Sequence, residues 1–197
     1  QHFTHRAHEI FRVLVGQIHI LETMQPYEFL QFRSELMPAS GFQSVQFREV
    51  EFILGLKDRR YIDFFKDQPE TQVCLEKRMG GRDVRTAFYD MLRRRGFAVG
   101  ETLTHAVWEQ DEAAREPLLE ALRPIYENRD EYLSLYLLAE SLLDLDEYLS
   151  LWRYHHVRVV ERIIGFKRGT GGSGGVSYLM KTVDKQIFPG LWAVRTR

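Results

Sequence analysis

Apolar residues recur at a spacing near 3.6 along almost the whole chain, which is the period of an α-helix. No segment shows the strict alternation typical of a half-buried strand, and no strand–helix–strand succession is evident. Proline and glycine divide the pattern into helical segments. The first covers about residues 1–24 and the last about residues 176–187, and a short tail follows Pro189. The sequence therefore predicts an all-α, bundle-like single domain over residues 1–197.

Two interruptions are expected in the second half of the chain. A helical region over about residues 110–128 contains Pro117 and Pro124, and proline can begin a helical turn but not continue one. Asp144 and Asp146 are expected to mark the junction between a strongly apolar helix and the helix that follows it.

Composition narrows the class of protein. Hydrophobic residues make up 44% and charged residues 28% of the 197 residues, as in an ordinary globular protein, and the net charge of −1 does not favour a nucleic-acid partner. The single cysteine, Cys74, cannot form an internal disulfide, and no Cys/His pair has the spacing of a zinc site. No signal peptide is visible, and no apolar run approaches the roughly 18 residues of a membrane span. A cytoplasmic protein without a membrane partner is expected.

Two adjacent histidines, His155 and His156, lie in the helical pattern that ends at Gly165. Neighbouring residues on a helix point about 100° apart, so these two cannot share a face. The positions three, four and seven residues from His156 are Leu149, Trp152, Arg153, Val159, Val160 and Ile163. His156 therefore lies in a mostly apolar stripe, whereas His155 faces a more charged edge. An imidazole in such a stripe is either a hydrogen-bonded core residue or an axial ligand of an iron porphyrin.

A glycine-rich stretch, residues 169–175, follows that helix. A phosphate cradle would need a preceding strand and a lysine after the last glycine, and neither is present. A flexible linker is a second interpretation, although only about twenty residues follow. The third is a mobile lid that closes over a ligand held by His156, with Thr170 and backbone amides donating hydrogen bonds.

An arginine shares a helix face with aromatic residues in the segment 26–36. Phe29, Phe32, Arg33 and Leu36 lie at positions i, i+3, i+4 and i+7. Either the arginine stem lies along apolar surface while its head reaches water, or the guanidinium is held in an apolar pocket to receive a carboxylate.

Two long segments carry a resemblance to a known family. They are ILETMQPYEFLQFRSELMPASGFQSVQFREVEFILG at residues 20–55 and WRYHHVRVVERIIGFKRGTGGSGG at residues 152–175, with IYENRDEY at 125–132 in further support. Together they resemble the tryptophan 2,3-dioxygenases, enzymes that bind haem b, and the resemblance covers nearly the whole chain. It implies the all-α dioxygenase fold with a haem pocket and a homotetramer.

The resemblance also implies roles for particular residues. His156 matches the proximal ligand of the haem iron, and Arg33 matches the arginine that binds the substrate carboxylate. The other positions that match substrate or haem pocket residues are Phe29, Leu36, Ser40, Gly41 and Thr170. Phe29 stands where some members have tyrosine, so one hydrogen bond to the carboxylate is missing.

The chain departs from the family pattern at two places. Gly174 replaces the second serine of the usual G-T-G-G-S-S-G loop. The family segment that supplies a distal histidine is not matched, because residues 1–24 align with the helix that follows it. His2, His5 and His8 are therefore not that histidine, and no catalytic residue is assigned. The upstream helices are expected to be absent.

The function that the resemblance implies is insertion of O2 across the indole C2–C3 bond of L-tryptophan. The product is N-formylkynurenine, at the first step of tryptophan catabolism through kynurenine. Two alternatives remain at this stage. One is a related haem enzyme acting on another indole, and the other is a haem-binding or purely structural helical protein without oxygenase activity.

Overall fold

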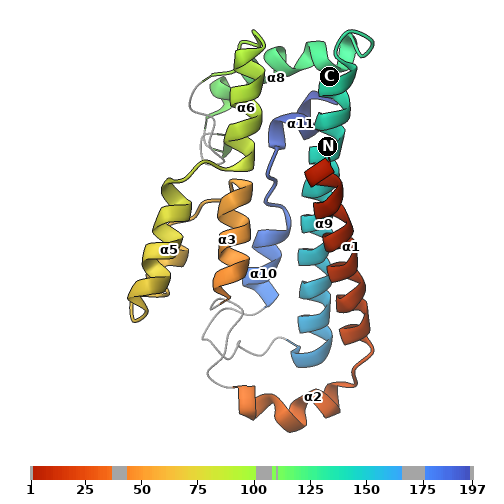
Figure 1. Ribbon diagram of the computed structural model, residues 1–197. Helices are drawn as coiled ribbons and strands as arrows, with labels where there is room; N and C mark the ends of the chain where they lie inside the picture. Colours follow the sequence, from red (N-terminus) through yellow and green to blue (C-terminus); the bar gives the residue numbers. More distant parts are fainter. Residues whose placement is uncertain (1, 37–43, 101–107, 110, 166–175, 196–197) are drawn as a thin grey trace. The chain divides into compact units, whose positions relative to one another are not determined.

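The computed structural model describes residues 2–36, 44–100, 108–109, 111–165 and 176–195. All regular elements within these ranges are helices, and no strand occurs in them, which confirms the all-α prediction (Figure 1). The helices are α1 (His2–Glu22), α2 (Pro26–Phe32), the 3-10 helix η1 (Arg33–Leu36), α3 (Val45–Leu54), α4 (Arg60–Asp63), α5 (Pro69–Gly80), α6 (Val84–Arg94), α8 (Glu112–Glu127), α9 (Leu133–Ile164), α10 (Val176–Val183) and α11 (Pro189–Val194). The described helices are all too short or too polar to cross a membrane.

The chain forms two compact units. The first contains Gln1–Ser44 and Asp144–Lys185, and the second contains Val45–Leu143 and Gln186–Arg197. Helix α9 contributes its first part to the second unit and the remainder to the first. The expectation of one domain over the whole chain stays a prediction.

Helix α9 runs without a break for 32 residues, so the predicted junction at Asp144 and Asp146 is wrong. The apolar stripe continues through this region, where Leu142, Leu145 and Leu149 are all buried. Asp146 itself is only 2% exposed. Neither proline nor glycine interrupts the stretch, and the continuous buried stripe outweighs the low helix propensity of aspartate. The helix ends before Gly165, whose φ of +62° is the left-handed conformation that favours glycine.

Helix α8 contains both prolines that were expected to interrupt it. Leu118, Leu122 and Ile125 lie on one face of this helix and are buried, so tertiary packing compensates for the backbone hydrogen bonds that proline removes. The tail expected after Pro189 instead forms the short helix α11, which packs on α8. A β-carbon at Gly190 would lie 2.7 Å from Leu118 Cδ2, so glycine permits this close approach.

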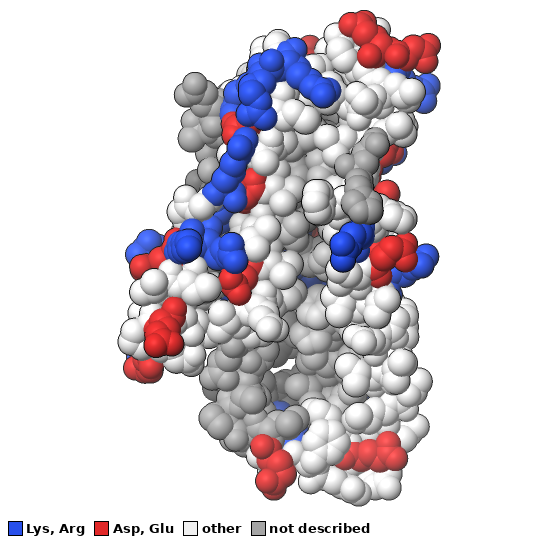
Figure 2. All heavy atoms as spheres, in the orientation of Figure 1, with Lys and Arg blue, Asp and Glu red and all other residues white. Residues whose placement is uncertain are grey.

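Basic side chains gather over α6 on the face drawn in Figure 2, with acidic side chains among them. Arg93 and Arg94 lie in the last turn of α6 and Arg95 is its C-cap, where cations oppose the negative end of the helix dipole. Asp90 pairs with Arg93 and, at 2.8 Å, with Arg82. These charges are partly compensated by acidic neighbours on the same surface.

The start of α6 is joined to the end of α3 by buried polar contacts. Asp83 is the N-cap of α6, and its Oδ1 accepts a 2.7 Å hydrogen bond from the Thr86 amide. Its second oxygen, Oδ2, lies 2.8 Å from Lys57 Nζ. Arg85 Nη2 donates to the Gly55 carbonyl at 2.6 Å, and Gly55 adopts a φ of +104° after α3. Burial alone would raise the pKa of Asp83, but the bonds from Lys57 and Thr86 lower it overall.

Replacing Asp83 tests this junction. Asp83→Ala should lower the free energy of unfolding at neutral pH by about 1–2 kcal/mol, as expected for loss of a cap, and Asp83→Asn by less, because an amide can still cap α6. A depressed carboxyl pKa stabilises the fold above about pH 4 and ceases to do so as pH falls through the folded value. The free energies of unfolding of the wild type and Asp83→Asn, measured by urea titration, should therefore become similar at low pH. Asp63→Ala, at an exposed carboxylate of α4, is the control and should change little. Equal stability of Asp83→Ala and wild type would contradict the assignment.

Candidate functional site

The imidazole of His156 lies in the C-terminal half of α9 in a half-buried position. Its ring stacks on that of Trp152 one turn earlier, with ring centroids 5.3 Å apart and an interplanar angle of 26°. Burial lowers the pKa of His156, because a charged imidazolium is poorly solvated there. Among the described residues, none forms a hydrogen bond or ion pair with this ring. The side chain is thus held as a neutral imidazole, the form that binds metals.

The helix face of His156 is apolar, as the sequence predicted. Val159 and Ile163, three and seven residues further along α9, are buried together with Ile18 of α1. Phe29, Trp152 and Ile164 pack against this cluster from its edges. Helices α1 and α2 therefore both meet the part of α9 that carries His156 (Figure 1).

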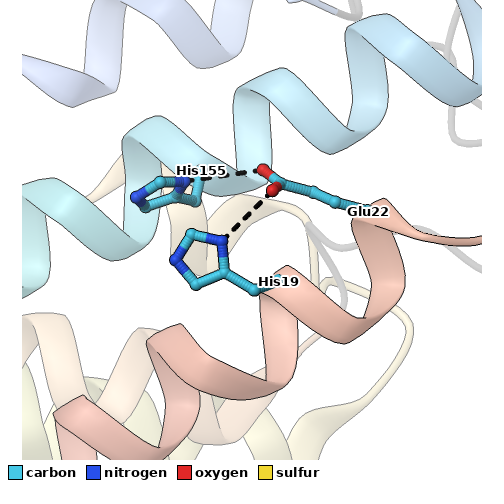
Figure 3. Close-up of side chains that lie close together, drawn as sticks. All are labelled: His19, Glu22 and His155. Carbon is cyan, nitrogen blue, oxygen red and sulfur yellow. Dashed lines mark hydrogen bonds and ion pairs between the residues drawn. The ribbon is translucent and has the colours of Figure 1, made fainter.

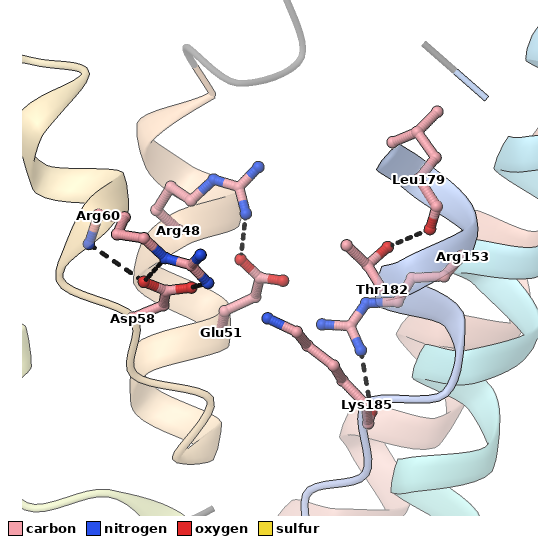
Figure 4. Close-up of polar contacts among 8 residues, drawn as sticks. All are labelled: Arg48, Glu51, Asp58, Arg60, Arg153, Leu179, Thr182 and Lys185. Carbon is pink, nitrogen blue, oxygen red and sulfur yellow. Dashed lines mark hydrogen bonds and ion pairs between the residues drawn. The ribbon is translucent and has the colours of Figure 1, made fainter. Parts of the chain in front are cut away.

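Polar contacts attach the end of α10 and the residues after it to the same helix. Arg153, the one charged member of the His156 stripe, is 3% exposed and donates from Nη1 to the Lys185 carbonyl at 3.1 Å (Figure 4). One turn earlier, Ser150 Oγ donates to the Val183 carbonyl at 3.1 Å. The chain that follows the glycine-rich stretch in sequence thus contacts α9 again, at Val183 and Lys185.

The predicted carboxylate-binding segment is only partly a regular α-helix. Helix α2 begins at Pro26, and Glu28 Oε2 accepts a 3.2 Å hydrogen bond from the Gln25 amide ahead of it. The α-helix expected over residues 26–36 tightens at Arg33 into the 3-10 helix η1. Phe29 is half-buried and meets Phe32 edge to face, with centroids 5.2 Å apart. Arg33 is half-buried one turn beyond Phe29.

The structure brings Phe29 to the apolar cluster of Ile18, Val159 and Ile163, and two members of this cluster belong to the His156 stripe. Arg33 follows in the same segment, as the first residue of η1. Leu36 ends η1, but its side chain lies outside the described residues. Ser40, Gly41 and Thr170 also lie outside the described residues, as does most of the glycine-rich stretch.

One polar cluster was not anticipated from the sequence. His155 points away from the His156 stripe and faces Glu22 and His19 of α1 (Figure 3). The charged edge expected for His155 is therefore present, but its partners come from another helix. Only the spacing of His19 and Glu22, three residues apart on one helix face, could have indicated half of this cluster.

The structure thus defines an all-α protein with a neutral histidine in an apolar helix face. Comparison with known families makes this more specific. The family model for tryptophan 2,3-dioxygenase matches residues 2–95 and 113–197. The chain belongs to the tryptophan 2,3-dioxygenase family, as its sequence motifs predicted.

Curated relatives agree with the family assignment. A tryptophan 2,3-dioxygenase of Nocardioides sp. is 45% identical over the whole chain, which covers 69% of that relative. A tryptophan 2,3-dioxygenase of Geobacillus thermodenitrificans is 40% identical over 98% of the chain and 69% of the relative. One from Xanthomonas euvesicatoria is 39% identical over 97% of the chain and 64% of the relative. The chain thus spans about two thirds of the length of these relatives.

The protonation of His156 provides a test of the site geometry. Because burial lowers its pKa, the imidazole should titrate below the value of about 6.5 typical of free histidine. NMR of the histidine rings, without added cofactor, should show a lower midpoint for His156 in the folded chain than in concentrated urea. As pH falls through that range the unfolded state takes up the proton first, so stability should decrease. A midpoint that is equal or higher in the folded chain would contradict the buried, neutral imidazole.

Proposed function

We propose that this chain catalyses the reaction for which its relatives are named, the oxidative opening of the indole ring of L-tryptophan. Both atoms of O2 enter the substrate, the C2–C3 bond breaks, and the product is N-formylkynurenine. The observation that supports the proposal is His156, a neutral and half-buried imidazole stacked on Trp152. By resemblance it corresponds to the haem ligand of the family motif. The homotetramer stays a prediction.

The surroundings of His156 fit haem b. A haem ligand needs a neutral ring nitrogen in apolar surroundings, and the ring is held in one orientation by stacking on Trp152 beside buried Val159 and Ile163. Haem, when bound, supplies the activation of O2, which no amino-acid side chain provides. In that case His156 would hold the iron through a ring nitrogen, and Val159 and Ile163 would supply apolar surface beside it.

The remaining residues of the proposed site bind and orient the substrate. Arg33 receives the carboxylate of tryptophan through two parallel hydrogen bonds, and Phe29 beside it forms part of the apolar wall. Thr170 contacts the amino-acid end of the substrate. The residues proposed to line the pocket are Phe29, Leu36, Ser40 and Gly41. Holding the indole in one position contributes to the rate by removing the entropy cost of alignment.

Loss of haem from His156→Ala is the direct test of the ligand. The wild type, loaded with haem and passed through a desalting column, should keep a Soret band, and His156→Ala should lose it because the iron has no axial nitrogen. His5→Ala, at an exposed position of α1, should keep the band. A wild type without Soret absorbance after haem addition would eliminate this proposal. Unaltered haem binding by His156→Ala would show that another residue is the ligand.

Substitution of Arg33 tests the substrate site separately. A charge-assisted hydrogen bond contributes about 1.5–3 kcal/mol, so loss of even one of the two bonds should raise the KM for tryptophan by at least roughly tenfold. Arg33→Ala should therefore show such a rise with the Soret band retained. Arg33→Lys keeps the charge but not the two-pronged geometry and should give an intermediate KM. Arg12→Ala, at an exposed arginine of α1, is the control. The KM is measured by steady-state kinetics. An unchanged KM for Arg33→Ala would contradict the assignment of Arg33 as the residue that binds the carboxylate.

A further inference from the structure

We propose that His19, Glu22 and His155 form a second metal site, which binds a divalent transition-metal ion of the zinc class and joins α1 to α9. The three side chains converge from two helices of the same compact unit (Figure 3). This inference concerns a different ion and a different helix face from those of the haem proposal, and it does not depend on that proposal.

The ligand atoms are already close to the separations that a metal requires. His19 Nδ1 lies 3.2 Å from Glu22 Oε2, and His155 Nδ1 lies 3.5 Å from Glu22 Oε1. One ligand atom from each of the three residues can be chosen so that all lie within 4.8 Å of one another. Zinc bonds of about 2.0–2.1 Å in tetrahedral geometry place ligand atoms roughly 3.3–3.4 Å apart. The two distances to Glu22 already match this value, and the widest separation must shorten by up to about 1.4 Å for all three residues to bind one ion.

The charges at the cluster also suit a cation. Glu22 lies between the two imidazoles, with one carboxylate oxygen toward His19 and the other toward His155. The carboxylate supplies negative charge between two neutral donors. The centroids of the two imidazole rings lie 4.3 Å apart and the ring planes make an angle of 66°. The rings thus meet edge to face and neither covers the other.

The donor set selects the class of metal. Two imidazole nitrogens and one carboxylate oxygen are typical ligands of zinc and of neighbouring transition metals, whereas calcium and magnesium require mostly oxygen. The side chains of Glu22 and His155 are 26% and 23% exposed, and that of His19 is 51% exposed. A fourth position can thus be taken by water. An ion held there would link the end of α1 to α9.

The proposed zinc site and the proposed haem ligand are adjacent in sequence but can be removed separately. His155 and His156 point about 100° apart on α9, and their described neighbours differ. His155 faces α1 through Glu22, whereas His156 stacks on Trp152. Loss of one site should leave the other in place.

Zinc binding by the full chain is the test. After treatment with EDTA and dialysis, titration with ZnCl2 in a calorimeter should show one site per chain and a rise in Tm. His19→Ala, Glu22→Gln and His155→Ala should each weaken this binding by at least about tenfold, as removal of one direct ligand is expected to do. His5→Ala and His156→Ala are the matched controls and should retain zinc affinity.

A spectroscopic measurement covers the case in which a variant is destabilised. Co2+ in place of zinc should give the visible absorption of a four-coordinate site in the wild type, and His19→Ala, which alters the most exposed ligand, should lose it while keeping its helical circular dichroism. Wild-type protein that binds no zinc overturns the proposal, as does unchanged affinity in all three ligand variants. The haem spectrum of the same samples reports on His156 alone, so failure of one proposal is distinguishable from failure of the other.

Discussion

The apolar contact between α1 and α9 is the interaction on which both proposed sites depend. Ile18 of α1 packs against Val159 and Ile163 of α9, and removing this apolar surface from water fixes the rotation of the two helices about their axes. With that rotation set, His156 shares its side of α9 with Val159 and Ile163, and His155 faces the carboxylate of Glu22. Two neighbouring histidines thereby acquire different chemistry from a single packing arrangement.

The sequence predicted those features that depend on one helix at a time. The stripe around His156 could be derived from spacing alone, and the structure places Val159 and Ile163 in it, buried. Local signals misled where tertiary packing outweighed them, as at Pro117 inside α8 and at buried Asp146 inside α9. The cluster of His19, Glu22 and His155 could not be predicted, because it requires the register between two helices that are more than a hundred residues apart in sequence.

Family membership and physical structure contribute different parts of the functional argument. Membership in the tryptophan 2,3-dioxygenase family supplies the reaction, and the roles proposed for matched positions such as Arg33 come from the resemblance of the motifs. The structure supplies a reason why His156 suits its proposed role, since burial keeps the imidazole neutral and Trp152 stacks on it. It also separates His156 from His155, which the shared sequence motif places side by side.

The hydrogen bonds that attach the end of α10 and the residues after it to α9 determine which substitutions would break this attachment. Ser150 and Arg153 both donate to backbone carbonyls, those of Val183 and Lys185, and every residue type offers the same carbonyl. For these two bonds, only the α9 residues contribute side chains, so only their identities matter for the attachment. Positions 183 and 185 contribute only backbone carbonyls, which every residue type keeps, whereas replacing Ser150 or Arg153 by a residue without a side-chain donor removes the bond.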